Sequence, residues 1–113
     1  MTITQSAVLN PILAAEAKRL GAALARLRIA RNMKQDQAAL RAGLSRNTAY
    51  RLEKGDPGIA MGQFLRYLDA IVPGKTLLEF LSETDPALAA LGAQEQRRRA
   101  RELTKRELDE IDF

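Results

Sequence analysis

Apolar residues recur along most of this chain at intervals of three and four, the spacing that lines up side chains on one face of an α-helix. Leu20, Leu24 and Leu27 show this pattern clearly, with arginines at most of the intervening angles. The apolar positions are mainly Ala and Leu, which favour helices over strands. Five segments follow the helical spacing and predict five helices, at about residues 12–30, 35–42, 46–54, 60–71 and 76–82. The apolar stripe of the fourth is expected to face the core and consists of Met61, Phe64, Leu65, Leu68 and Ile71.

The breaks between these segments carry residues suited to ending and starting helices. Gly43 can adopt the left-handed conformation that closes the second helix, and Ser45 can cap the start of the third. Gly55 is followed by Asp56, Pro57 and Gly58, a combination that stops a helix and turns the chain. The second and third helices are therefore expected to be short and joined by a tight turn.

The two ends of the chain differ from this central part. Residues 1–11 are mostly uncharged polar and small apolar residues and predict an N-terminal arm, whereas residues 94–113 hold six basic and six acidic residues, basic first and acidic last. Pairs such as Glu102 and Arg106 have the spacing that supports a solvated helix, after a short apolar piece at 87–91. We expect an all-α protein with an arm at 1–11, one domain at 12–83 and a charged tail, helical in part, at 84–113.

Composition removes several classes of function. The chain has no Cys and no His, so it lacks thiolate ligands, the commonest metal ligand and the commonest general base. We therefore expect no enzymatic activity, no metal and no cofactor. Apolar stretches are far shorter than a membrane span needs, and no secretory signal is recognisable, so we expect a cytoplasmic, nucleoid-associated protein.

The distribution of charge suggests an anionic partner for the first half of the chain. Residues 1–60 hold ten basic and four acidic residues, while residues 61–94 hold two basic and four acidic residues. The net charge of the whole chain is +4. The positive potential therefore belongs to the part that contains the two short helices, where it can attract the phosphates of nucleic acid.

Arg46, Asn47 and Thr48 stand on the first turn of the third helix, where a helix placed in the DNA major groove reaches base edges. Arginine matches the paired acceptors of guanine, and asparagine matches the acceptor and donor of adenine. The amides at the start of the preceding helix can bind a phosphate. Each of these residues also has a simpler explanation as a solvated or helix-capping residue.

Taken together and in this order, these residues resemble the xenobiotic-response-element family of helix-turn-helix proteins, which includes phage repressors and many antitoxins. The resemblance covers about residues 20–81. The matching positions are Leu27-Arg28, Lys34-Gln35, Ala39, Ala42-Gly43-Leu44-Ser45 and Leu52-Glu53-Lys54-Gly55.

The resemblance implies a five-helix repressor-type domain and a role for each matching residue. Arg28 and Glu53 would form a partly buried structural ion pair, and Gln35 would both contact a phosphate and support the recognition helix. Lys34 replaces the hydroxyl residue that commonly caps the second helix in the family. Base contacts are expected from Arg46, Asn47 and Arg51, and backbone contacts from Gln35, Lys34, Ser45, Thr48, Tyr50 and Lys54.

One recognition helix reads only a few base pairs, so a homodimer on a palindromic double-stranded operator is expected. The simplest function is transcriptional repression of the protein's own operon. The layout of the whole chain, a DNA-binding core followed by a charged tail, is similar to HipB-like antitoxins. This resemblance implies a toxin partner, a HipA-type kinase, bound through the C-terminal region at 77–113, which DNA binding does not need. A stand-alone phage-type repressor and a restriction–modification controller or activator share the same pattern, and the sequence leaves them open.

Overall fold

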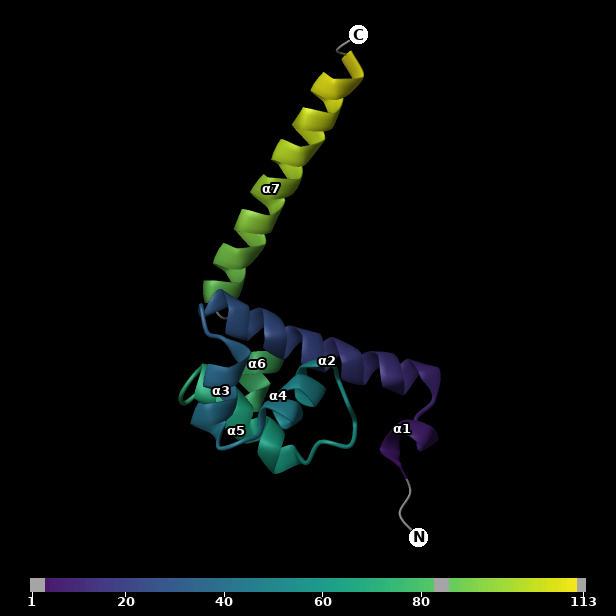
Figure 1. The fold of residues 1–113 in the computed structure, drawn as a ribbon, viewed down its shortest axis with the longest axis vertical. Helices are drawn as coiled ribbons and strands as arrows, with labels where there is room; N and C mark the ends of the chain where they lie inside the picture. Colours follow the sequence, from purple (N-terminus) through teal and green to yellow (C-terminus); the bar gives the residue numbers. More distant parts are fainter. Residues whose placement is uncertain (1–3, 83–85, 112–113) are drawn as a thin grey trace.

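The computed structural model describes residues 4–82 and 86–111, and every regular element within these ranges is an α-helix. Five helices build the central domain, which agrees with the all-α, five-helix expectation (Figure 1). They are α2 (Pro11–Ala30), α3 (Gln35–Ala42), α4 (Arg46–Glu53), α5 (Met61–Ile71) and α6 (Leu77–Leu81). Two further helices flank it, α1 (Gln5–Val8) inside the expected arm and α7 (Pro86–Ile111).

The helix boundaries follow from capping residues. Asn10 accepts a hydrogen bond from the backbone N–H of Leu13 at 2.9 Å, and Pro11 occupies the first helical position of α2. Gly43 closes α3 with a φ of 69°, the left-handed conformation that glycine adopts without strain. Ser45 caps α4 by accepting from the N–H of Thr48 at 3.0 Å. The predicted turn between the two short helices is therefore confirmed.

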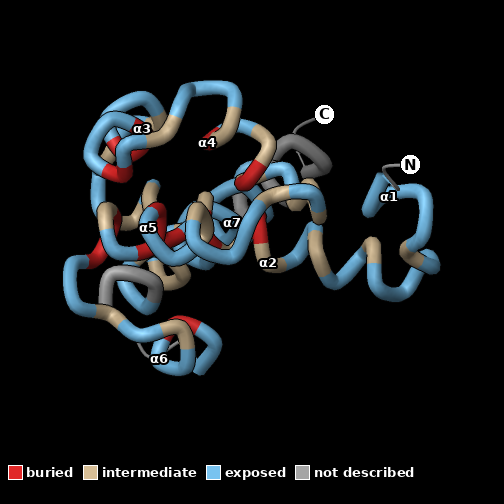
Figure 2. The backbone as a smooth tube through the Cα atoms, turned by 90° about the horizontal axis from the view of Figure 1, so that it is seen from below, coloured by how far each residue is buried: buried red, intermediate tan, exposed pale blue. Residues whose placement is uncertain are grey.

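The core lies between α2 and the four helices packed beneath it, as the buried positions in Figure 2 show. Small alanines on α3 and α4 let these helices approach α2 and α5 closely. The fully buried side chains include Leu24, Leu27, Ala38, Ala49, Tyr67 and Leu68.

The apolar stripe on α5 differs from the expected one. Met61 and Leu65 were expected in the core, yet they are 67% and 43% exposed, while Tyr67 is completely buried. The helix is turned so that Phe64, Tyr67 and Ile71 face inward. A tyrosine can take this position because its hydroxyl finds a hydrogen-bond acceptor there, on Glu53.

The C-terminal region is one continuous helix instead of a short apolar piece followed by a separate charged segment. Pro86 is its first residue, and no further proline interrupts it. The early part of α7 packs against α2, where Arg26 and Glu95 form an ion pair at 2.8 Å. Beyond this crossing α7 points away from the other helices (Figure 1), and its residues from Gln96 to Leu103 are exposed.

Candidate nucleic-acid interface

The first turn of α4 presents polar side chains to solvent on a firmly capped backbone. The hydroxyl of Ser45 accepts from the N–H of Thr48 at 3.0 Å and donates to the Thr48 hydroxyl at 2.9 Å. Asn47 is exposed, and the Arg46 side chain is 85% exposed. The backbone of this turn is therefore held in place while Arg46 and Asn47 point outward.

Among the described residues, the Arg46 guanidinium makes one weak ionic contact, with Asp36 of α3 at 3.9 Å. Both side chains are solvated, and exposed pairs of this kind contribute little to stability. Loss of the contact with Asp36 would therefore cost little free energy, so Arg46 is free to bind another hydrogen-bond acceptor, such as a DNA base.

The other end of α4 is anchored through one carboxylate, that of Glu53. Arg28 donates to both of its oxygens, at 2.7 and 3.0 Å, and Gln35 donates to Oε1 at 3.0 Å. The hydroxyl of Tyr67 donates to Oε2. Because the four residues come from α2, α3, α4 and α5, a single side chain connects four helices of the domain.

Burial makes this network strong. The side chains of Arg28 and Glu53 are 15% and 6% exposed, so their charges are poorly solvated and depend on each other. The hydrogen bond to Glu53 is the main cause that raises the pKa of Arg28. Burial, and after it the hydrogen bond to Glu53, raises the pKa of Tyr67, which therefore keeps its proton and stays a donor. Arg28 also donates to the carbonyl of Met33 at 2.8 Å and so holds the turn before α3.

Two glycines allow the end of α4 to lie directly against α2. A Cβ on Gly21 would stand 2.5 Å from the backbone N of Gly55, and a Cβ on Gly55 would stand 2.4 Å from Cα of Lys18. Gly55 also has a φ of 77°, which disfavours any other residue. Sequence reasoning missed Gly21 as a contact point, although a glycine inside an amphipathic helix is a recognisable signal of close approach.

The residues expected to contact bases do not form one group. Arg51 lies one turn after Asn47, and its Nε donates to Asp56 Oδ2 at 2.7 Å. Asp56 also accepts from the N–H of Gly58 at 2.8 Å. The hydrogen bond from Arg51 is the main cause that lowers the pKa of Asp56. In this structure Arg51 is therefore held at the end of α4, whereas Arg46 and Asn47 are directed to solvent.

The residues expected near the DNA backbone surround the exposed turn. Lys34 precedes α3 and, lacking a side-chain acceptor, leaves the capping to Gln37, whose Oε1 accepts from the N–H of Lys34 at 3.1 Å. Lys54 lies over the ring of Tyr50, with Nζ 5.5 Å from the ring centroid. Both Lys34 and Lys54 are exposed cations beside the two short helices.

Arg66 of α5 was not expected at this surface. Its Nη2 donates to the carbonyl of Gly43 at 3.3 Å, so an exposed guanidinium lies beside the turn between α3 and α4. No signal for Arg66 is recognisable in the sequence, because it lies on a helix whose apolar residues indicate a role in the core.

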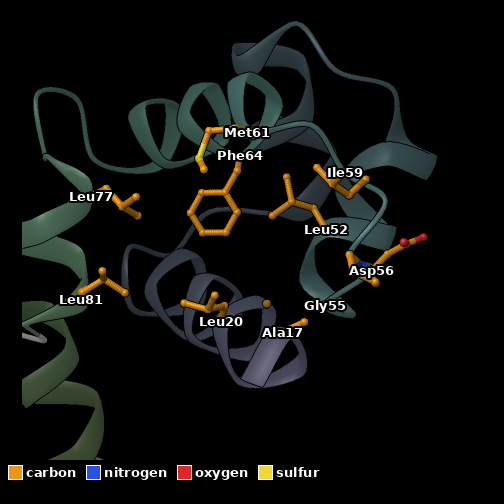
Figure 3. Close-up of a pocket in the computed structure, with 12 residues that line it drawn as sticks. Ala17, Leu20, Leu52, Gly55, Asp56, Ile59, Met61, Phe64, Leu77 and Leu81 are labelled. Atoms are coloured by element: carbon orange, nitrogen blue, oxygen red, sulfur yellow. The ribbon is translucent and has the colours of Figure 1, made fainter. Parts of the chain in front are cut away.

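An apolar cavity of about 270 Å3 lies on another part of the domain, between α2, α5, α6 and the segment after α4. Leu20, Leu52 and Phe64 face one another across it (Figure 3). Leu77 and Leu81 of α6 form its side, and Asp56 stands at its edge. The cavity is almost entirely apolar and shares no exposed side chain with the first turn of α4.

The described residues contain no cluster of three or more acidic side chains placed to hold a metal ion. Within residues 4–82 and 86–111, no helix has the length and apolar character needed to cross a membrane.

Two short helices joined by a tight turn, with a polar and exposed first turn on the second, are the arrangement found in helix-turn-helix DNA-binding domains. Residues 19–72 are similar to a protein family described as a helix-turn-helix domain. No curated protein and no solved structure matches the chain.

Proposed function

We propose that this protein is a transcriptional repressor that reads a palindromic operator in double-stranded DNA as a homodimer. The observation that carries the proposal is the exposed first turn of α4 on a rigid frame, with Ser45 and Thr48 fixing the backbone and Glu53 fixing the far end. Preorganised side chains lose little freedom when they bind, which favours sequence-specific recognition.

In the proposed complex, Arg46 and Asn47 contact base edges directly. Arg51 joins them after a phosphate or base replaces its contact with Asp56. The backbone amides at the start of α3 bind a phosphate, with Lys34 and Gln35 beside it. The neighbouring DNA backbone is contacted by Ser45, Thr48, Tyr50 and Lys54. Since phosphate contacts release counterions, affinity should fall steeply as salt concentration rises.

The dimer follows from the small number of bases that one α4 can read. Two copies related by a twofold axis place their recognition helices on half-sites about one helical turn apart, about 34–36 Å between centres. The proposed target is the operon that encodes the protein, so the operator would lie beside the protein's own gene.

Fluorescence anisotropy tests the proposal with DNA from the region upstream of the protein's own gene and a scrambled duplex of equal length. Wild type should prefer its own DNA, and Arg46→Ala and Asn47→Ala should each reduce that preference by about 1 to 3 kcal/mol. Arg19→Ala, which removes an exposed arginine of α2, is the matched control and should keep the preference. Equal binding of both duplexes by wild type and all variants would rule out sequence-specific repression.

Neutralisation of a toxin is the second candidate function. The favouring observation is apolar exposure on α6, where Leu78 and Leu81 are 80% and 53% exposed. Leu81 also lines the apolar cavity. DNA binding through α4 does not require this surface, whereas a partner such as a HipA-type kinase could cover it. If the adjacent gene encodes such a kinase, the two proteins should co-purify, and Leu78→Asp with Leu81→Asp should abolish the complex while operator binding remains.

A further inference from the structure

Much of the described part of α7 is exposed to solvent. Its early residues contact α2, but residues 96–103 and Lys105 are exposed, and the far end of the helix lies away from the domain (Figure 1). Helices in proteins gain most of their stability from tertiary packing, and packing of α7 is confined to its early residues. The exposed part of α7 is therefore a surface suited to a partner.

Charge is sorted along the sequence of the second half of α7. Residues 97–101 contain four arginines and no acid, and residues 107–111 contain Glu107, Asp109 and Glu110 and no base. The helix dipole favours cations in the last turn, yet the last turn of α7 holds none. The order of charges is thus unfavourable for the helix alone, which points to an interaction between molecules.

We propose that α7 pairs with α7 of a second copy in antiparallel orientation, the basic segment of each against the acidic segment of the other. The inference deepens the proposed function, since it rests on the dimer proposed there and assigns its interface. A parallel pair would place four arginines beside four arginines. Within one chain, the basic segment at 97–101 and the acidic segment at 107–111 lie at different heights of one continuous helix, so they cannot lie side by side.

The structure offers a receiving surface for the acidic segment. A cleft of about 660 Å3 opens between α2 and α7, with Ile29 and Leu91 as its apolar part and Arg97, Arg98 and Arg101 along one wall. The cation of Arg26 on the opposite wall is already paired with Glu95. The three arginines remain available for carboxylates that arrive from the second copy.

The spacing along the helix also suits a DNA-binding dimer. A pair centred on Thr104 brings residues 97–101 of one copy level with residues 107–111 of the other. The two crossings of α7 over α2, between Leu91 and Glu95 in each copy, would then lie about 27 to 39 Å apart at about 1.5 Å per residue. This separation of the two crossings is of the same size as the distance of about 34–36 Å between half-sites one turn apart, so the two domains can occupy neighbouring half-sites.

Charge reversal in the full-length chain tests the pairing by sedimentation equilibrium without DNA. One variant replaces the four arginines of 97–101 with Glu, and a second replaces Glu107, Asp109 and Glu110 with Lys. Each should raise the dimer dissociation constant at least about tenfold at low salt, because attraction becomes repulsion. A chain that carries both reversals should recover wild-type dimerisation.

Circular dichroism verifies that every variant stays helical, and Lys18→Glu with Arg19→Glu on α2 is the control for overall charge. Single reversals that dimerise like wild type, or a double reversal that does not recover, would overturn the pairing. If operator preference persists in that case, the proposed repressor function stands without it. Wild type that stays monomeric both free and on its operator would overturn the pairing and the proposed dimer together.

Discussion

The two ends of α4 differ in almost every physical respect. At its start, Arg46 and Asn47 are exposed and make little contact with the rest of the chain. At its end, Glu53 is nearly buried, accepts hydrogen bonds from three other helices and is followed by a glycine in direct contact with α2. The end of α4 fixes the helix in the domain, whereas its start is the part that we propose contacts DNA. Substitutions at the end should affect stability, and substitutions at the start should affect DNA binding.

Glu53→Ala should have the largest effect on this comparison. It leaves Arg28 as an uncompensated, nearly buried cation and deprives Tyr67 of its acceptor, so the free energy of unfolding should fall by about 3 to 5 kcal/mol. Urea denaturation followed by circular dichroism measures it. Glu16→Ala, which removes an exposed carboxylate of α2, should change stability by less than about 0.5 kcal/mol. A loss at Glu53 as small as that at Glu16 would show that the network does not anchor α4.

Gly21→Ala should rank second. The added methyl group would overlap the backbone of Gly55, and such overpacking costs about 1 to 3 kcal/mol. Gly62→Ala is the matched control, since nothing lies within 4 Å of its added Cβ and alanine favours a helix. Thermal unfolding of both variants should show a lower midpoint for Gly21→Ala and an unchanged or higher midpoint for Gly62→Ala. The reverse order would contradict the close contact between α2 and α4.

Ser45→Ala tests the cap at the start of α4. Loss of the cap should reduce the free energy of unfolding by about 1 kcal/mol, and it frees the backbone on which Arg46 and Asn47 stand. Ser45→Asn keeps a capping acceptor and should retain most of the stability. The denaturation midpoint and the operator affinity should both fall in Ser45→Ala and stay near the wild-type values in Ser45→Asn. Equal losses in the two variants would contradict a capping role of the Ser45 hydroxyl.

Asp56 should give the smallest effect, and it depends on pH. Its pKa is lowered in the folded state, mainly by Arg51, so its contribution to stability is complete above the ordinary pKa of aspartate and is lost as pH falls through the lower, folded value. The stability difference between wild type and Asp56→Asn should therefore be constant near neutral pH and shrink below about pH 4. Urea midpoints between pH 3 and pH 7 measure it, and a difference that does not vary with pH would contradict the contact.

Much of the fold could be predicted from local patterns. The three- and four-residue spacing of Leu and Ala predicted helices at the places where α2 to α6 lie, and Gly43 and Ser45 predicted the turn, because capping depends on neighbouring residues alone. The exposed first turn of α4 was also foreseeable from its polar residues. The inward position of Tyr67 and the contact at Gly21 were not, since each depends on a residue far along the chain.

The C-terminal region shows the same limit. Its charges suggested a solvated helix, but the extent of α7, the ion pair of Arg26 with Glu95 and the cleft beside it depend on how α7 crosses α2. The helices, their caps and the place of the polar turn follow from the sequence, because they depend on interactions within a few residues. The joining of four helices by Glu53 and the exposure of residues 96–103 of α7 follow only from the fold, because they depend on how segments distant in sequence meet in space.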